Sequence, residues 1–441
     1  MALNTDLSLR NSTIYSLYLR NHSPEGTLRA AQGDLARIRN LGTDILWLLP
    51  IHPIGEKNRK GSAGSPYAIR DYRGINPEYG TLEDFTGFVE EAHRLGMKVM
   101  IDVVYNHTSP DSLLFEQHPE WFYQKPGGGP GNRVGEWYDI IDLDFSNQDL
   151  QDYLIDTLEY WLSLGVDGFR CDVAPLLPLE FWMLARERCE ARKPGVIWLS
   201  ESVEPRFLLE MRNRGYGCLS DGEIYRAFDV AYDYDSFDVF KLYLEGRADF
   251  EDFIDVKRRQ QYILPGNYLK LRFTENHDQE RSRHWIPDPR AHRNWTAFTA
   301  FEQGTFLVYG GQEVADPHRP DLFDKDPVRW ETEPGFAGFI QKLTKVRRDP
   351  IHCQGFYQIH RTSTRGVVVA TYRNTAEDLS VSRLRLGIFT LEDKRGTLDL
   401  TEVLPQGLLN LEAKNLLDGE PVRLTQGKTS IPREPVILDL L

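Results

Sequence analysis

Ionisable side chains stand directly after several short apolar segments that have the composition of β-strands. In chain order they are His107, Arg170, Asp172, Glu201, His277 and Asp278. Two carboxylates that follow neighbouring strands could lie about 5–5.5 Å apart, the separation that retaining glycoside hydrolysis requires. One would attack the anomeric carbon, and the other would protonate the leaving oxygen and later deprotonate water. These residue types therefore point to chemistry at a glycosidic bond.

Each of these residues has an ordinary explanation when it is taken alone. A single acidic residue at a strand end is usually a surface group or a helix cap, and a single histidine is usually a hydrogen-bonded core residue. The occurrence of these residues together favours a functional site, because folding does not require several polar groups at the same end of consecutive strands. Asp102 lies within a predicted strand, and we interpret it as a structural residue that holds a neighbouring loop by hydrogen bonds.

The segments that must position these side chains alternate between strand and helix patterns over about the first 350 residues. The predicted strands are residues 13–19, 44–50, 98–104, 168–172, 196–200, 228–232, 268–273 and 305–309. Amphipathic helical patterns lie between most of them, and the pattern is least clear in the sixth unit. Eight strand–helix units predict an α/β fold, a closed (β/α)8 TIM barrel, whose reactive residues lie where strands end and loops begin.

Two regions interrupt this alternation. Residues 108–145 are rich in proline and glycine, and a connection of this length inside a barrel is usually functional. We predict a short inserted subdomain there, after the third strand, which leaves the catalytic barrel in residues 1–107 and 146–349. After Pro350 strand-like segments such as residues 366–372 replace the helices, so residues 350–441 are predicted to form a C-terminal all-β sandwich domain.

The composition excludes several classes of partner. The 441 residues include 52 Lys and Arg against 66 Asp and Glu, which gives a formal net charge of −14. A surface this acidic repels nucleic acid and anionic membrane headgroups. No apolar run has the length of a transmembrane helix, and the start lacks a signal-peptide pattern. The cysteines form no CxxC pair, which favours reduced thiols and a cytoplasmic protein, or a secreted one if a signal was removed.

Four segments carry a specific resemblance. They are Asp102-Val-Val-Tyr-Asn-His107, Gly168-Phe-Arg-Cys-Asp172, Ser200-Glu201 and Glu275-Asn-His-Asp278. In this order they are similar to the motifs of glycoside hydrolase family 13, the α-amylase family, and residues 65–72, 309–313 and 323–330 resemble it as well. The resemblance covers the predicted barrel from about Thr13 to Arg348 and, more loosely, the C-terminal domain. One such motif arises by chance, whereas the ordered set is specific.

The resemblance implies a role for the three carboxylates. Asp172 resembles the nucleophile that forms a glycosyl-enzyme, Glu201 the general acid/base, and Asp278 the carboxylate that binds sugar hydroxyls. Arg170 precedes Asp172 by two residues, so both side chains face the same way on a strand, and the cation would keep the carboxylate ionised. Glu201 would have to start protonated, which requires a raised pKa.

The resemblance also implies residues that bind substrate and metal. His107 and His277 are similar to histidines that donate hydrogen bonds to the sugar at the cleavage point, and Tyr67 to the ring that stacks on that sugar. Asn106 matches a residue that binds structural calcium in many members. Further ligands would come from the inserted segment, where the candidates are Asp111, Asp139 and Asp142. The alternative is a barrel that is stable without metal, in which Asn106 only hydrogen-bonds the loop. The chemistry itself requires no cofactor.

The sequence also departs from the family pattern. Many α-amylases carry Lys-His shortly after the nucleophile to bind the leaving side of the glucan, but here residues 173–178 read Val-Ala-Pro-Leu-Leu-Pro. Residues 202–205 after Glu201 differ from most amylases too. These departures leave the product pattern and the preferred chain length undetermined by the resemblance.

The leading hypothesis is a retaining α-glucoside hydrolase that acts on α-1,4-linked glucan or maltooligosaccharides. The alternatives on the same scaffold are an α-glucosidase, a cyclomaltodextrin hydrolase or a transglycosylase active on sucrose or trehalose. A non-catalytic relative that binds glycan or a partner protein would usually lack one of the carboxylates, and all of them are present here. A metal-dependent hydrolase is disfavoured because the histidines are dispersed. The oligomeric state is not encoded in any pattern.

Overall fold

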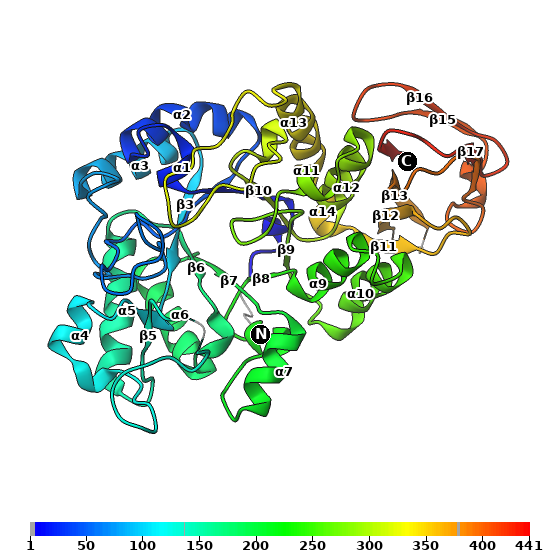
Figure 1. The fold of residues 1–441 in the computed structure, drawn as a ribbon. Helices are drawn as coiled ribbons and strands as arrows, with labels where there is room; N and C mark the ends of the chain where they lie inside the picture. Colours follow the sequence, from blue (N-terminus) through cyan, green and yellow to red (C-terminus); the bar gives the residue numbers. More distant parts are fainter. Residues whose placement is uncertain (1–4, 136, 377–379) are drawn as a thin grey trace. The chain divides into compact units, whose positions relative to one another are not determined.

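A closed barrel of parallel strands forms the frame of the molecule. The computed structural model describes residues 5–135, 137–376 and 380–441. Within these ranges eight parallel strands close into a barrel in the order β1-β10-β9-β8-β7-β6-β3-β2 (Figure 1). Their bounds are β1 Thr13–Leu17, β2 Ile45–Leu48, β3 Lys98–Val103, β6 Gly168–Cys171, β7 Ile197–Ser200, β8 Val230–Tyr232, β9 Lys270–Arg272 and β10 Thr305–Tyr309. The predicted (β/α)8 barrel is confirmed, including its sixth strand.

Most strand residues are apolar because helices and barrel interior cover both faces of the strands, although β3, β6 and β9 also bury charged residues such as Asp102, Arg170 and Arg272. Every residue of β2 is buried, as are all residues of β6 and β7. The strands are shorter than the apolar runs that predicted them. Leu49 and Ile51, for example, stay buried after β2 has ended. The Leu49 N–H still donates to the Leu17 carbonyl at 3.0 Å, and the residues after it form the loop above the strand end.

The helices begin and end where local signals place them. The helix α3 starts with a capping box, in which Thr81 and Asp84 satisfy each other's backbone N–H groups. It ends before Gly96, whose φ of +77° favours glycine. The helices of the barrel region are α1 Leu19–His22, α2 Leu28–Asn40, α3 Leu82–Arg94, α5 Gln148–Ser163, α6 Leu179–Arg192, α7 Pro205–Asn213, α8 Asp221–Ile224, α9 Tyr234–Leu244, α10 Phe250–Ile263, α11 Ser282–Trp285, α12 Pro289–Phe301 and α13 Gly335–Arg347.

The segment after β3 is a small subdomain built on an antiparallel pair. The strand β4, His107–Thr108, pairs with β5, Ile141–Asp142, so that His107 lies opposite Asp142. Between them lie the helix α4, Leu113–Gln117, and the 3-10 turn η2, Pro119–Trp121. This pairing fixes the inserted segment to the chain immediately beyond β3.

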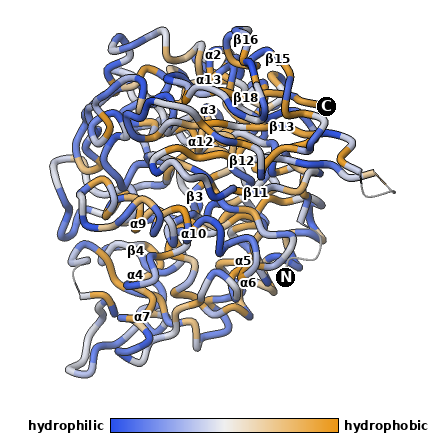
Figure 2. Tube along the Cα trace, turned by 90° about the vertical axis from the view of Figure 1, so that its right-hand side faces the viewer, coloured by the Kyte–Doolittle hydropathy of each residue, from blue (hydrophilic) through white to orange (hydrophobic). Residues whose placement is uncertain are grey.

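The C-terminal part is antiparallel β structure. After α14, Ile351–Gln354, the strands β11 Phe356–His360, β12 Val367–Thr375, β13 Val381–Thr390 and β18 Val436–Asp439 form one sheet. Two-stranded ribbons pair β14 Thr397–Asp399 with β17 Lys428–Ser430, and β15 Leu411–Lys414 with β16 Pro421–Leu424. Leucines from sheet and ribbons, such as Leu386, Leu398 and Leu424, share one core. Figure 2 shows apolar residues along β12 and β13. The predicted all-β domain is confirmed as this sheet with its ribbons.

The chain divides into two compact units according to its contacts. The first contains Ile14–Tyr234 and Arg319–Arg329, and the second contains Asp6–Thr13, Asp235–His318 and Trp330–Leu441. Across the described ranges no helix has the length and apolar character needed to cross a bilayer. All four cysteines are free thiols.

Candidate active site

The strand ladder places two carboxylates just beyond β6 and β7 of the first unit. Asp102 of β3 lies opposite Arg170 of β6, which in turn lies opposite Leu199 of β7. Hydrogen bonds then extend the ladder by one residue, from Asp172 N–H to the Val103 carbonyl at 2.9 Å. Another runs from Glu201 N–H to the Cys171 carbonyl at 3.0 Å. The carboxylates after neighbouring parallel strands are thereby held at the same end of the barrel wall.

Arg170 connects these carboxylates. Its Nη1 lies 2.8 Å from Asp102 Oδ1 and 2.9 Å from Asp172 Oδ1, and its Nη2 lies 3.0 Å from Glu201 Oε2. The side chains of Arg170 and Asp102 are fully buried, whereas those of Asp172 and Glu201 are 9% and 11% exposed. Arg170 and Asp102 therefore form the floor of the cluster, and Asp172 and Glu201 are the members that a substrate can reach.

The charges of the cluster are unbalanced. Burial alone lowers the pKa of Arg170, but the negative charges of Asp102 and Glu201 outweigh burial and hold that pKa well above its ordinary value. Burial raises the pKa of Asp102 to about 7, although Arg170 pulls in the opposite direction. One guanidinium facing three carboxylates leaves an excess of negative charge. This is the condition under which one carboxyl group of a cluster retains a proton near neutral pH.

Aromatic rings enclose the guanidinium. The Arg170 Cζ atom lies 5.2 Å from the ring centroid of Trp47, 5.7 Å from that of Tyr67 and 5.4 Å from that of Tyr232. Arg170 Nε also donates to the Tyr232 hydroxyl at 3.3 Å. The Tyr67 hydroxyl donates to Asp102 Oδ2 at 3.2 Å, so Asp102 holds the loop after β2, as the sequence predicted. Trp47 and Tyr232 were not predicted, although Tyr232 ends a strand and could have been found by that signal.

The residue after Asp172 has an unusual backbone. Val173 has φ of +35° and ψ of +41°, a left-handed conformation that is costly for a β-branched side chain. This conformation directs the Val173 N–H to Glu201 Oε2, at 2.8 Å. The backbone thus donates to the proposed acid/base at the point where many family members carry Lys-His. Trp182 Nε1 fixes the next residue by donating to the Ala174 carbonyl at 3.0 Å.

His107 lies at the base of the inserted segment. Its ring is buried, and burial lowers its pKa to about 4, against the pull of Asp142, so the imidazole is neutral at pH 7. The Nδ1 atom lies 3.1 Å from the amide nitrogen of Asn106. The ring of Trp137 lies 5.8 Å away, centroid to centroid, and is partly exposed. Trp137 was missed because an isolated tryptophan in a glycine-rich loop carries no positional signal.

Asp278 and His277 belong to the second unit, after β9. His277 is buried, and its Nε2 lies 3.1 Å from Asp278 Oδ2. The Asp278 N–H donates to Asn276 Oδ1 at 2.9 Å, which closes a tight turn. The Asp278 side chain remains 37% exposed. The structure therefore pairs these two predicted residues and leaves the carboxylate accessible.

The residues predicted as calcium ligands do not fit a calcium ion. Both carboxylate oxygens of Asp142 accept from nitrogen, Oδ2 from Arg133 N–H at 2.7 Å and from Arg133 Nη1 at 3.3 Å, and Oδ1 from the Asn106 amide at 3.4 Å. Asp139 pairs with Lys60 at 2.7 Å. Asp111 Oδ2 accepts from a backbone N–H at 2.9 Å. Calcium requires six to eight oxygen ligands, and the described residues contain no acidic, histidine or cysteine cluster suited to a metal.

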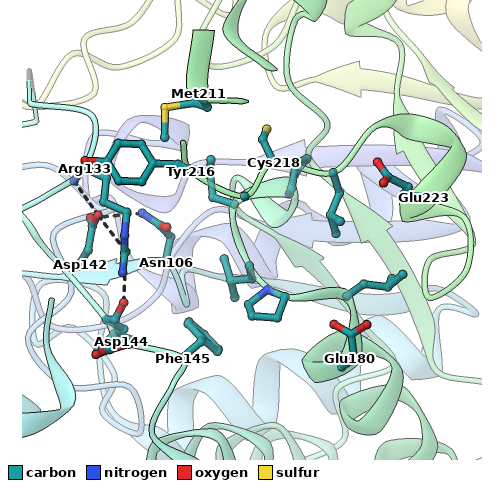
Figure 3. A pocket seen from close by; sticks show the side chains of 18 of the residues that line it. Asn106, Arg133, Asp142, Asp144, Phe145, Glu180, Met211, Tyr216, Cys218 and Glu223 are labelled. Carbon is teal, nitrogen blue, oxygen red and sulfur yellow. Dashed lines mark hydrogen bonds and ion pairs between the residues drawn. The ribbon is translucent and has the colours of Figure 1, made fainter. Parts of the chain in front are cut away.

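A cavity of about 580 Å³ in the first unit is lined by Asn106, Arg133 and Asp142, and its lining does not include Asp172 or Glu201. Its walls come from residues 142–146 of the inserted segment, residues 175–180 after Asp172, and residues 216–219. In Figure 3 Asn106, Arg133 and Asp142 gather on one side of it, and Glu180 and Glu223 lie on the other. The segment that replaces Lys-His is thus one wall of a space that a small ligand can enter.

Comparison with known proteins decides the family. Residues 13–138 match the α-amylase catalytic domain, and residues 358–438 match the bacterial α-amylase C-terminal domain. A solved α-amylase from Lactobacillus plantarum is 44% identical, with a TM-score of 0.93, over 99% of this chain and 100% of that one. The chain belongs to the α-amylase family. As a member of this family it is a glycosidase or transglycosylase.

Other members of the α-amylase family differ in activity. A maltogenic α-amylase from Thermotoga neapolitana is 33% identical, with a TM-score of 0.86, over 98% of this chain and 99% of that one. The alpha-1,4-glucan:maltose-1-phosphate maltosyltransferase of Salinibacter ruber is 34% identical over 224 residues, which are 45% of this chain and 34% of that protein. The chain thus spans about a third of the length of this curated relative. The relatives therefore include both hydrolytic and transferring enzymes.

Proposed function

We propose that this protein is a retaining α-glucoside hydrolase that cleaves α-1,4-linked glucan or maltooligosaccharides. The observation that carries the proposal is the buried Arg170 guanidinium, which pairs with Asp102, Asp172 and Glu201 and leaves the last two accessible. The cation favours ionised carboxylates, as the nucleophile must be, and one cation for three carboxylates leaves surplus negative charge that favours a proton within the cluster. Since Arg170 contacts Asp172 and Glu201 alike, the assignment of Asp172 as nucleophile and Glu201 as acid/base rests on their motifs. A retaining mechanism requires one carboxylate in each role.

In the first step Asp172 attacks the anomeric carbon while Glu201 gives its proton to the glycosidic oxygen. The bond between the anomeric carbon and that oxygen breaks, and the sugar becomes bound to Asp172 through an ester. In the second step Glu201 takes a proton from water, the water oxygen attacks the same carbon, and Asp172 is released. Two inversions at one carbon retain the α configuration.

The remaining residues bind and orient the sugar. Tyr67, which Asp102 holds through its hydroxyl, stacks on the sugar at the cleavage point. His107 and His277 donate hydrogen bonds to its hydroxyls. Asp278 binds hydroxyls and favours the positive charge that develops on the ring in the transition state. Its assignment rests on its position after β9 and on its motif.

Transfer to a sugar acceptor is the second candidate. It is supported by the maltosyltransferase relatives and by residues 173–178, which replace the polar pair that many amylases use on the leaving side. An apolar wall there would favour an acceptor hydroxyl over water in the second step, because it excludes water.

Product analysis separates the two candidates. Purified protein is incubated with starch, maltotriose, pullulan, isomaltose and sucrose, and separately with maltose 1-phosphate and a glucan acceptor. Hydrolysis predicts shorter maltooligosaccharides from starch, released first as the α anomer in proton NMR, and none from isomaltose. Transfer predicts products longer than the acceptor. Asp172→Asn is the matched inactive control, which should fold and bind glucan but turn over at least about 10⁴-fold more slowly. Absence of both cleavage and transfer in the wild type would refute the proposal.

A further inference from the structure

Arg133 lies where the resemblance placed a calcium ion. The resemblance implied a metal bound by Asn106 and by a carboxylate of the inserted segment, and Asp142 is the carboxylate that the structure brings to Asn106. In Figure 3 the Arg133 side chain occupies the space next to Asp142, on the side of the cavity where Asn106 also lies. The charge that faces Asp142 therefore belongs to the protein itself.

The contacts of Arg133 are those of a bridging cation. Its Nη1 lies 3.3 Å from Asp142 Oδ2 and 3.3 Å from the Leu143 carbonyl, while its own N–H donates to the same Asp142 oxygen at 2.7 Å. Its Cζ lies 4.5 Å from the ring centroid of Tyr123. The Arg214 guanidinium donates to its carbonyl at 2.6 Å. Arg133 thus engages a carboxylate, a carbonyl and a ring face, which are ligands that suit a guanidinium.

Asp142 needs a cation because it is buried. Its side chain is 2% exposed, and burial raises its pKa despite the backbone hydrogen bond from Arg133. Asp142 lies opposite His107 in the β4–β5 pair, and its neighbour Leu143 donates to the Asn106 carbonyl at 3.0 Å. The charge of Arg133 consequently stabilises the junction that fixes the inserted segment to the strand of His107.

A calcium ion at this position would conflict with Arg133. Two positive charges about 4 Å apart repel each other strongly in a partly buried site. The Asn106 amide also directs its nitrogen, which is a donor and no metal ligand, towards Asp142. The arrangement therefore meets the electrostatic need of Asp142 with a guanidinium and provides no oxygen cage for a divalent ion.

We propose that Arg133 is the built-in cation of this junction, which neutralises Asp142 in place of a calcium ion, so that the stability of the folded protein does not depend on calcium. The proposal is independent of the proposed reaction. A chelator would destabilise a family member that has calcium at this junction. In this chain the cation is the side chain of Arg133, which a chelator does not remove.

Thermal unfolding of the whole chain tests the proposal. The midpoint of the wild type in EDTA should agree with that in millimolar CaCl2 within about 1 °C, since a saturated structural site would shift it by several degrees. Protein exposed to calcium and then dialysed should retain far less than one calcium per chain by atomic emission. A midpoint that falls in EDTA and recovers with calcium, or stoichiometric retained calcium, would overturn the proposal.

Substitutions test the role of the side chain itself. Arg133→Met should lower the midpoint by about 3–5 °C, because Asp142 then stays buried without a cation. Arg226→Met is the matched control, since Arg226 is an exposed arginine on the same cavity, and it should leave the midpoint within about 1 °C. Arg133→Lys keeps the charge and should recover part of the loss, which also covers the case that Arg133→Met fails to fold. Equal midpoints for the Arg133→Met and Arg226→Met variants would contradict the role of Arg133.

A double-variant cycle identifies the partner. If Arg133 acts through Asp142, then Arg133→Met combined with Asp142→Asn should melt within about 2 °C of Arg133→Met alone, because the buried charge has been removed together with its cation. Losses that simply add would show that the two residues act independently, and would overturn the assignment.

Discussion

Replacement of Arg170 by Met tests the central element of the proposed site. Met preserves much of the apolar volume between Trp47, Tyr67 and Tyr232, but it removes the positive charge that faces Asp102, Asp172 and Glu201. We expect the carboxylates to bind protons at higher pH, so that less of the nucleophile is ionised, and we expect the acidic limb of the pH–rate profile to move upwards.

The size of the shift follows from the distances. A nitrogen–oxygen separation of 2.9 Å places the centres of the two charges about 4 Å apart, and at an effective dielectric constant near 20 they interact by about 4 kcal/mol. One pH unit corresponds to about 1.4 kcal/mol, so the acidic limb should rise by as much as about 3 units. On the acidic side of the profile, kcat/KM should fall by up to about 10³-fold. The free energy of unfolding should fall by about 3–5 kcal/mol, because buried carboxylates lose their cation.

The assay is kcat/KM on maltotriose from pH 4 to 9, together with urea unfolding. Arg186→Met is the matched control, because Arg186 of α6 pairs at 2.7 Å with Asp229, the residue before β8, in the same unit. It should lose stability and keep the acidic limb of the wild type. Arg170→Lys keeps the charge and should keep the limb within about 1 unit, at a lower rate, since Lys cannot span three partners. An unmoved limb in a folded Arg170→Met variant, with kcat/KM within threefold of wild type, would refute the reasoning.

Three further outcomes are expected. Glu201→Gln should slow maltotriose cleavage by at least about 10²-fold but affect an aryl glycoside with an acidic leaving group far less, and equal losses on both substrates would exclude Glu201 as the acid. Burial lowers the pKa of His52 to about 4, so the neutral ring adds stability that is complete above about pH 6.5 and is lost as the pH falls towards 4. In His52→Gln the free energy of unfolding, measured with urea, should fall less steeply over this pH range, by up to about 1.4 kcal/mol per pH unit. An unchanged pH dependence would contradict this. Burial would raise the pKa of Asp349, but Arg383 and Arg385 hold that pKa at about 2. Asp349→Asn should therefore be less stable than the wild type at pH 7, and the difference should disappear as the pH falls from about 4 towards 2. A difference independent of pH would show that the charge of Asp349 is not its cause.

Local rules explain how much of the molecule could be predicted from its sequence. Apolar runs of strand length identify most of the barrel strands, because a strand covered on both faces is mainly apolar. The spacing of Arg170 and Asp172 predicts that they face the same way, since side chains alternate along a strand, and their 2.9 Å ion pair agrees with this. Candidate residues at strand ends follow from the parallel order of the barrel.

Local sequence rules do not predict the partners that complete the cluster around Arg170. Trp47 contacts Arg170 from a strand far away in the chain, and nothing in its own neighbourhood distinguishes it from a core aromatic, whereas Tyr232 could have been found from its position at a strand end. The strained backbone of Val173, whose N–H meets Glu201, is likewise invisible in a run of apolar residues and prolines. The C-terminal domain was predicted as a sandwich from its short strands, but its sheet and ribbons are set by long-range pairing.

Periodicity and residues close together in the chain were enough to predict the barrel, the carboxylates at its strand ends and the family resemblance. The sequence also suggested a calcium ligand at Asn106. The contact between Arg133, which lies in a glycine-rich loop, and Asp142 became evident from the folded chain, where Arg133 supplies the positive charge. The reason is physical: whether a buried carboxylate needs a metal depends on which cation the folded chain already brings within about 4 Å, and that is a property of the loop's path through space.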